Sequence, residues 1–405
     1  MDLFLSIGVI FILGIAGGWI FDKIRIPKLV FYIFIGILFG PSLLNLFDST
    51  LLSISPYLRQ IALVIILTRS GLSLNLKTLK EIGRPAILMC FIPASFEILG
   101  VTLFGPLIFG ISIQEALLLG SVLAAVSPAV VVPRMIKLQN EGYGQEHHVP
   151  ELIMAGASCD DIFVIVLFYV FKGLVSTSSF EAISLLQIPL SIILGLLLGL
   201  LFSFLVILVF RKIKFNTIIK TIILLGVSFL MIGIENLTKP YISISSLLGI
   251  MLMGILVLFF TKEEAVEIKK NYDSLWNVFE ILLFALVGAA VDIKYAFSLD
   301  GLKIIGLLMI GLTFRSFGVF LCIIKTKFSW KEKIFIIISY LPKATVQASI
   351  GAIALSEGLA VGSLVLVAAV ISILITAPLG ALAMDLSYKK LLPLRKEQQP
   401  EVLLN

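Results

Sequence analysis

Two adjacent carboxylates, Asp160 and Asp161, interrupt the apolar run Gly156-Ala-Ser-Cys-Asp-Asp-Ile-Phe-Val-Ile-Val-Leu-Phe-Tyr169. The run is of the kind that crosses a membrane, where one carboxylate at the bilayer centre costs about 2.5–3.5 kcal/mol on insertion scales. A pair of them therefore needs a function. Neighbouring helix positions differ by about 100° in direction, so the two side chains face different partners. We interpret Asp160 and Asp161 as an ion and proton site, with the metal cation held by these two carboxylates.

The whole chain has the composition of a polytopic membrane protein. Of its 405 residues 59% are hydrophobic and 14% charged, and the mean hydropathy is +1.12. Many segments reach the length of about 20 apolar residues that a helix needs to cross a bilayer, and no alternating strand pattern is present. The prediction is an all-α fold of about 13 transmembrane helices, over residues 2–20, 29–47, 57–75, 85–104, 113–133, 150–171, 185–210, 217–236, 243–260, 275–292, 302–324, 331–355 and 361–384.

The loops between these spans alternate between rich and poor in basic residues along the chain. Most of the 31 basic residues fall after the odd-numbered spans and at the C-terminus. The positive-inside rule then places the N-terminus outside and the C-terminus in the cytoplasm. We expect a multi-pass protein of the cell membrane. The charge is confined to short loops and is no footprint for nucleic acid.

The order of unusual residues predicts two inverted repeats of six helices joined by a linker helix. Spans 1–6 start outside and spans 8–13 inside, with span 7 between them. Glu97 precedes Ser127-Pro128 in the first half, as Arg315 precedes Pro342-Lys343 in the second. Inverted repeats with interrupted helices at matching positions indicate a secondary transporter site.

Three prolines mark the expected interruptions of spans 5 and 12. Pro128 and Pro133 bracket Ser127-Pro-Ala-Val-Val-Val-Pro133, and Pro342 precedes Lys343. Proline frees backbone carbonyls, which at membrane depth must line a cavity or meet other protein. A simple proline kink is the alternative. Lys343 is expected to compensate the charge of Asp160 or Asp161, although snorkelling to the membrane surface is the other interpretation.

Four further polar residues are candidates. Glu97 and Arg315 sit at equivalent depths, and we expect them to form a buried ion pair whose loss in Glu97→Gln is rescued by Arg315→Gln. Ser158 lies three residues before Asp161 on the same helix face and is a candidate cation ligand, as is Ser127. The Ser158 hydroxyl bonded back to its own helix is an equal alternative. The chain contains no Walker A sequence, so no nucleotide, cofactor or enzymatic activity is expected.

Five motifs together resemble the NHA-type branch of the sodium/proton antiporters, in the cation:proton antiporter-2 group. They are Ala125-Val-Ser-Pro-Ala-Val-Val-Val-Pro133, Gly142-Tyr-Gly, Ser158-Cys-Asp-Asp-Ile162, Leu341-Pro-Lys-Ala-Thr-Val-Gln-Ala348 and Ser372-Ile-Leu-Ile-Thr-Ala-Pro378. The resemblance implies that Asp161 is the cation ligand and proton carrier, and that a basic residue neutralises Asp160. Many bacterial relatives carry that lysine on the span where this chain has Arg315, which leaves the proton-to-cation ratio open.

The resemblance also implies a homodimer in which the broken spans 5 and 12 cross near the aspartates. The implied parts are a dimerisation domain (1–83 and 217–300), a core transport domain (84–172 and 301–388), a linker helix (173–216) and a short cytoplasmic tail (389–405).

From these features we expect elevator-type alternating access that exchanges Na+ or Li+ for H+, with cation and proton competing for one carboxylate site. A K+/H+ antiporter is a second reading of the same oxygen ligands. An organic-anion symporter or a channel on a related fold belongs to another class. No run resembles the carbonyl filter of a channel, and a symporter of anions would favour small polar residues over two acids.

Overall fold

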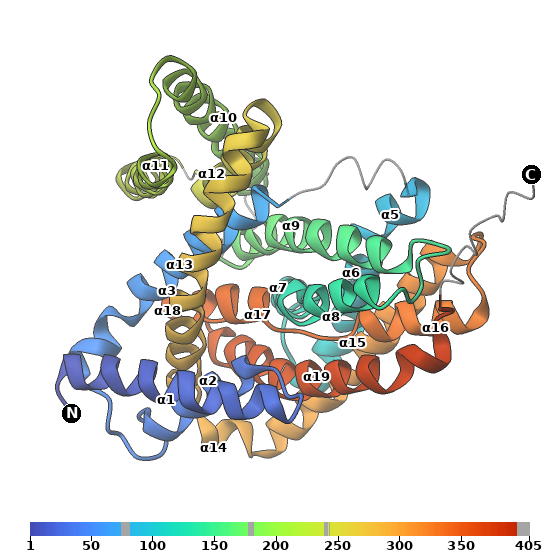
Figure 1. Ribbon diagram of the computed structural model, residues 1–405. Coiled ribbons are helices and arrows are strands. Elements are labelled where there is room, and N and C mark those ends of the chain that lie inside the picture. The colour runs from blue at the N-terminus through green and yellow to red at the C-terminus, as the bar shows by residue number, and fades with distance from the viewer. Residues whose placement is uncertain (74–81, 177–181, 239–241, 243, 395–405) are drawn as a thin grey trace, which may run out of the picture.

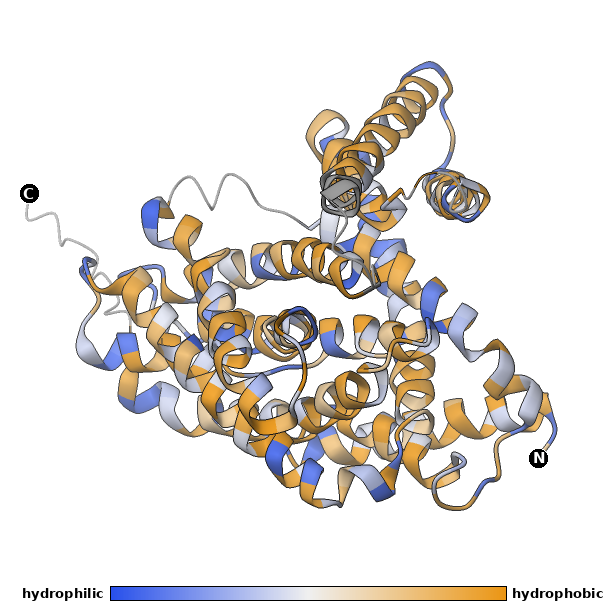
Figure 2. Ribbon diagram, turned by 180° about the vertical axis from the view of Figure 1, so that it is seen from behind, coloured by the Kyte–Doolittle hydropathy of each residue, from blue (hydrophilic) through white to orange (hydrophobic). Residues whose placement is uncertain are grey.

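The computed structural model describes residues 1–73, 82–176, 182–238, 242 and 244–394. These residues form α-helices and no strand. Ten of the described helical segments are long and apolar enough to cross a membrane, and three shorter apolar helices lie at the remaining expected spans. Apolar residues predominate along the helices (Figure 2). The chain is thus an all-α, multi-pass membrane protein. Residues 395–405 of the expected tail, and the expected span ends at 74–75 and 243, lie outside the described residues.

The first half of the chain contains both a broken helix and the helix of the aspartates. Its helices are α1 (Leu3–Lys23), α2 (Lys28–Phe39), α3 (Ser49–Gly71), α5 (Arg84–Met89), α6 (Ile92–Phe109), α7 (Ile113–Leu123), α8 (Pro128–Asn140) and α9 (Val149–Ser176). The helix α7 begins with a capping box in which Ser112 and Glu115 satisfy each other's backbone N–H groups.

The second half repeats the broken helix after a long connecting helix. Its helices are α10 (Ala182–Lys212), α11 (Thr217–Thr238), α12 (Ser246–Phe260), α13 (Lys262–Ala289), α14 (Ile293–Ala296), α15 (Leu299–Ile323), α16 (Trp330–Ser339), α17 (Thr345–Ile350), α18 (Ile353–Ser356) and α19 (Gly362–Leu391). The broken element α16 also begins with a capping box, from Ser329 and Glu332.

Three expected spans have different limits in the structure. The helix α3 begins at Ser49, where the Asp48 carboxylate caps it, and not at residue 57. The helix α13 begins at Lys262, so the charged segment taken for a loop before residue 275 is helical. Lys220 and Glu264 form an ion pair there at 2.7 Å. Hydropathy marks the part of a helix that lies in lipid, whereas α13 continues past it with charged turns and α3 with a serine-containing start that Asp48 caps. The span at 29–47 ends as a helix at Phe39, before the Gly40-Pro41 turn.

Helix contacts divide the chain into two bundles (Figure 1). We call α1–α3 with α10–α13 the first bundle, in which α13 packs on α2 and α3, and α12 on α3 and α10. The second bundle is α5–α9 with α15–α19, in which α6 packs on α15, α9 on α7 and α8, and α19 on α16. The helices α17 and α19 touch the first bundle through α3, α13 and α2.

Glycines bring the helices of the first bundle into backbone contact. A Cβ on Gly36 of α2 would overlap the carbonyl oxygen of Ala285 of α13, and one on Gly288 would overlap that of Ile33. Lipid supplies no hydrophobic drive between helices, so close van der Waals approach at small residues holds them together.

We expect Gly36→Ala to destabilise the protein by about 1–3 kcal/mol, because the added methyl group separates α2 from α13. Thermal unfolding of the purified protein in detergent measures the effect. Gly8→Ala in α1 is the matched control, since a Cβ there meets no atom within 4 Å. An equal unfolding temperature for the two variants would contradict this account of the packing.

Candidate functional site

The two chain breaks lie against each other at the centre of the second bundle. The first break separates α7, which ends at Leu123, from α8, which starts at Pro128, and the second separates α16 from α17. The backbone N–H of Ser127 donates to the carbonyl oxygen of Pro342 at 2.8 Å. Pro128 stands in the first turn of α8, where its missing N–H leaves no gap in the helix.

Pro133 does not mark a break, contrary to the sequence-based expectation. It lies inside the continuous helix α8, and the unwound segment comes before Pro128. One helical turn after the N-terminus a proline removes a single backbone bond, which is too little to unwind the chain here. Pro342, by contrast, lies within the second break, between Ser339 and Thr345.

Asp160, the first aspartate, is bound by both the first break and the helix α15. Asp160 is fully buried on α9, and its Oδ2 atom accepts the backbone N–H of Val126 in the first break at 2.9 Å. The same oxygen lies 2.7 Å from Nη2 of Arg315 on α15. Bonds between a guanidinium and a carboxylate are short and strong, so Asp160 is held as an anion with a defined direction.

Arg315 connects the helices of the site. Its Nη1 atom lies 3.1 Å from Oε2 of Glu97 on α6 and donates to the carbonyl oxygen of Ala124 in the first break. Its Nε atom donates to the carbonyl oxygen of Tyr340 in the second break at 2.6 Å. The planar fork of an arginine, with five donors, suits such a junction and a lysine does not. The structure therefore brings Glu97 and Arg315 together and adds Asp160 to them.

Lys343 contacts Glu97 and neither aspartate. Its Nζ atom lies 2.5 Å from Oε2 of Glu97, and both side chains are fully buried. The backbone N–H of Lys343 donates to Oγ1 of Thr376 on α19 at 2.8 Å. Lys343 therefore forms no ion pair with either aspartate, and its expected compensation of their charge stays a prediction. Glu97 and Asp160 with Arg315 and Lys343 form a four-residue cluster of zero net charge.

Asp161 stands outside that neutral cluster. Its side chain is only 7% exposed, and among the described residues no hydrogen bond or ion pair engages its carboxylate. Other buried oxygen atoms of the helix breaks and their neighbours also lack a partner in the described part of the chain, namely Glu97 Oε1, Ser127 Oγ, Asp160 Oδ1, Tyr340 OH and Gln347 Oε1. Oxygen atoms are the ligands that hard cations prefer, and an unpaired buried oxygen is costly.

The two candidate serines behave differently. The hydroxyl of Ser158 donates to the carbonyl oxygen of Met154, one turn earlier in α9, at 3.0 Å. The alternative of a hydroxyl bonded to its own helix is therefore what the structure shows, although its oxygen keeps acceptor capacity. Ser127 is fully buried, and its hydroxyl has no partner among the described residues.

Three residues of this site were not singled out from the sequence. Gln347 of α17 donates to the carbonyl oxygen of Ala125 at 2.9 Å, which ties the second broken helix to the first break. Thr376 caps the second break, and the Tyr340 hydroxyl lies where a side chain on Gly156 would stand. Polar residues next to a proline in an apolar span are the signal that could have found Gln347.

Comparisons with known proteins identify the family. The family model for the transmembrane sodium/hydrogen exchanger matches residues 7–384. The chain belongs to the sodium/hydrogen exchanger family. It is 34% identical to sodium/hydrogen exchanger 9B2 of Homo sapiens over 347 residues, and 35% identical to sodium/hydrogen exchanger 9B1 of Mus musculus over 351 residues. Each match covers 84% of this chain, which spans 64% and 61% of the respective relative's length.

The fold of this family member is also that of a solved antiporter. The sodium proton antiporter MjNhaP1 from Methanocaldococcus jannaschii at pH 8 superposes with a TM-score of 0.79 at 20% identity, over 96% of this chain and 99% of that one. At this identity the likeness concerns the fold alone.

The stability of double variants tests the ion pairs of the four-residue cluster. We expect Glu97→Gln to cost about 3–5 kcal/mol of stability, because Lys343 loses its carboxylate partner in a buried place. Lys343→Gln in the same chain should restore most of the loss, since it removes the unpaired charge. Contrary to the sequence-based expectation, Arg315→Gln should not restore it, because that change deprives Asp160 of its partner. Thermal unfolding in detergent distinguishes the two double variants, and equal rescue by both would contradict the assigned pairs.

Proposed function

We propose that this chain is a secondary antiporter that exchanges Na+ or Li+ for H+ across a membrane. The observation that carries the proposal is the contrast between the two adjacent aspartates. Asp160 is neutralised by Arg315, whereas Asp161 is buried with no cation beside it in the described structure. A single uncompensated carboxylate binds either one cation or one proton.

Competition between cation and proton follows from the cost of burying charge. When the site closes, a bare Asp161 carboxylate loses its water without compensation, whereas the protonated or cation-bound form is neutral. A conformational change that buries the site is therefore populated only when Asp161 is loaded. Membership of the exchanger family, and similarity to relatives that are sodium/hydrogen exchangers, support this coupling.

The neutral cluster favours an exchange of one cation for one proton. Glu97, Asp160, Arg315 and Lys343 pair among themselves, so only Asp161 changes its load during the cycle. Each transport cycle then moves no net charge across the membrane. An exchange of two protons for one cation would add about 2.3 kcal/mol per 100 mV for the net charge moved.

We further propose that the second bundle moves as the core and that the first bundle without α10 is the scaffold of a homodimer, with α10 as the helix that links the two parts. The core would comprise residues 84–172 and 301–388, organised as two inverted repeats whose broken helices cross. The scaffold would comprise 1–83 and 217–300, with 173–216 as linker. The helix pairs that pack within each bundle support this division. An elevator-type motion, an outer N-terminus, a cytoplasmic C-terminus and a place in the cell membrane complete the proposal.

The test is proton movement in sealed vesicles with an acidified interior. Adding Na+ or Li+ chloride to wild-type vesicles should dequench an interior pH dye, and Asp161→Asn should lower the rate by at least about 100-fold, because its amide accepts no proton and carries no charge. With the membrane potential clamped at two values, the wild-type rate should be the same at both.

The outcomes separate the alternatives. A response to K+ alone would indicate a K+/H+ antiporter in place of the Na+ or Li+ selectivity proposed here. A rate that changes with the clamped potential would contradict the exchange of one cation for one proton. A wild-type chain that moves no protons with any alkali cation, or an Asp161→Asn chain that works normally, would overturn antiport at this carboxylate. Met154→Leu, a change beside the site on the same helix without a charge, is the matched control.

A further inference from the structure

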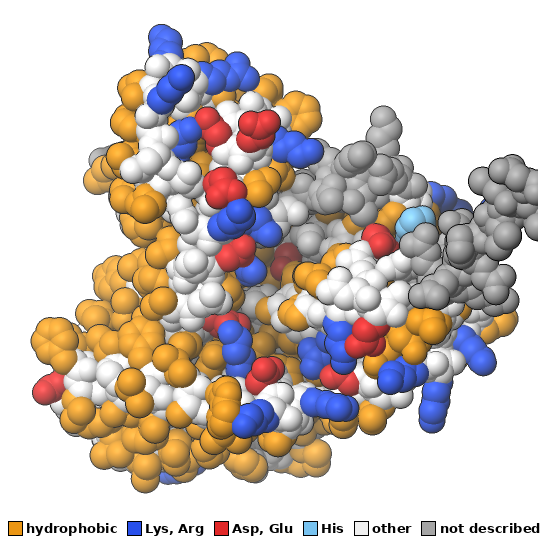
Figure 3. All heavy atoms as spheres, in the orientation of Figure 1, with side chains coloured by type: hydrophobic (Ala, Val, Ile, Leu, Met, Phe, Trp, Pro, Cys, Tyr) orange, Lys and Arg blue, Asp and Glu red, His pale blue; other side chains and the backbone are white. Residues whose placement is uncertain are grey.

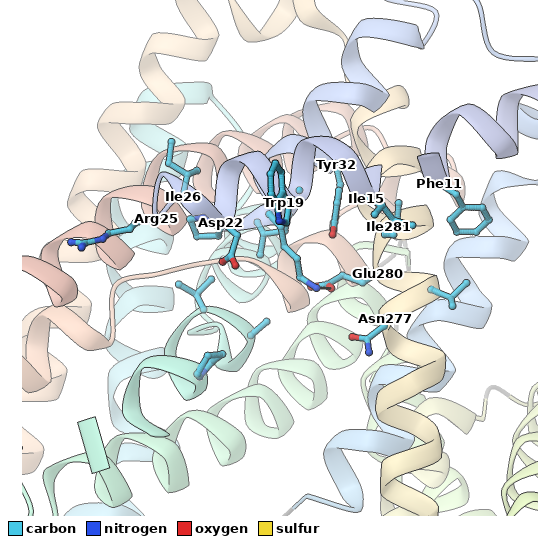
Figure 4. Close-up of a pocket in the computed structure, with 18 of the residues that line it drawn as sticks. Phe11, Ile15, Trp19, Asp22, Arg25, Ile26, Tyr32, Asn277, Glu280 and Ile281 are labelled. Carbon is cyan, nitrogen blue, oxygen red and sulfur yellow. Dashed lines mark ion pairs between the residues drawn. The ribbon is translucent and has the colours of Figure 1, made fainter. Parts of the chain in front are cut away.

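A cavity of about 810 Å³ lies between the two bundles, on the side of the α1–α2 loop. Its walls come from α1, α2 and α13 of the first bundle and from α8 of the second (Figure 4). Ala129 and Val130, in the first turn of α8, line it two and three residues beyond Ser127 of the first break. The cavity therefore extends to the start of α8, where the first break ends.

One buried carboxylate faces this cavity. Glu280 of α13 is 4% exposed, and its Oε2 atom lies 3.0 Å from Nζ of Lys28 at the start of α2. In Figure 4 Glu280 and Asn277 point into the cavity from α13, and Tyr32 points its hydroxyl toward the same space from α2. A buried carboxylate is costly unless a cation pairs with it, so the space opposite Glu280 favours a positively charged group.

The ammonium group of Lys28, which occupies the space opposite Glu280, is only loosely held. The Lys28 side chain is 45% exposed, and a lysine carries its charge on a flexible four-carbon stem. The other charged groups on the wall are Asp22, Arg25 and Arg134, and Arg134 is paired with Asp385 at 3.3 Å. When Lys28 swings away, Asp22 and Glu280 outnumber Arg25, and the cavity wall is negative. Figure 3 shows charged side chains along this face of α13, next to the apolar surface of α1.

We propose that Glu280 is a staging site for a hydrated alkali cation on its way to Asp161, and that Lys28 is the tethered competitor for that site. This inference rests on the proposed antiport. A cation entering from the α1–α2 side exchanges with the Lys28 ammonium at Glu280 and continues along the first turn of α8. The local carboxylate raises the concentration of both Na+ and H+ at the mouth, so it increases the apparent affinity for both from this side.

The experiment compares apparent KM values for Na+ in membrane vesicles of both orientations, made from cells that produce the full chain. With Na+ on the cavity side, Glu280→Gln should raise the apparent KM about 3- to 10-fold, as expected for one charge at intermediate dielectric. Lys28→Met should lower it, because the competitor is gone. The double variant should match Glu280→Gln alone, since Lys28 acts through Glu280. With Na+ on the opposite side, the KM should not change.

Lys23→Met is the matched control. It removes the same charge near the same end of α1, but Lys23 lies over the ring of Trp19 at 3.5 Å and outside the cavity wall. If Lys23→Met lowers the KM as much as Lys28→Met, the effect is one of general surface charge and the staging site is refuted.

Failure of the inference differs from failure of the antiport. Wild-type vesicles without Na+-dependent proton movement refute the proposed function itself. Active wild-type vesicles with the same cavity-side KM in Glu280→Gln and Lys28→Met refute the staging site alone. If Glu280→Gln does not fold, shown by its elution in detergent, Lys28→Met still decides, because an unchanged KM in that variant refutes the competitor role.

Discussion

The guanidinium of Arg315 is the interaction on which the second bundle depends. It binds carboxylates on α6 and α9 and backbone carbonyls in both breaks, all without exposure to solvent. Unwound backbone at membrane depth is tolerated only where protein satisfies it, and this one side chain satisfies part of each break. A buried charge network costs desolvation, which short ion pairs with good geometry offset in part. The arrangement therefore specifies the position of the aspartate helix more than it stabilises the fold.

The neutrality of that cluster gives the adjacent aspartates unlike environments. Asp160 has a structural role, since its Oδ2 atom accepts bonds from both Arg315 and the N–H of Val126. Asp161, next in sequence, points elsewhere around the helix and keeps an unpaired oxygen. The 100° between neighbouring helix positions thus gives two identical residues different surroundings, one paired and one unpaired.

Much of this could be predicted from the sequence, because the relevant signals are local. Apolar length located the spans, Pro128 and Pro342 located the breaks, and the carboxylates of α9 stood out by their cost in lipid. The Glu97–Arg315 contact followed from equivalent depth in the two halves. The partner of Lys343 could not be predicted, because Arg315 binds both Glu97 and Asp160 and the sequence does not tell which of the two carboxylates also receives the lysine. The start of α13 was missed because a charged helix beyond the bilayer has no hydropathy signal.

The helix α13 is held by two kinds of contact, backbone packing in its C-terminal part and ion pairs in its N-terminal half. Over 28 residues it is about 42 Å long. At the Ala285–Gly288 end it touches the α2 backbone directly, a contact that salt leaves unaltered. At the other end Asp273 binds Arg69 of α3 and Glu264 binds Lys220 of α11, and these partly exposed ion pairs weaken as ionic strength rises. The contacts of α13 in the first bundle therefore respond unequally to salt, since only the ion pairs weaken as ionic strength rises.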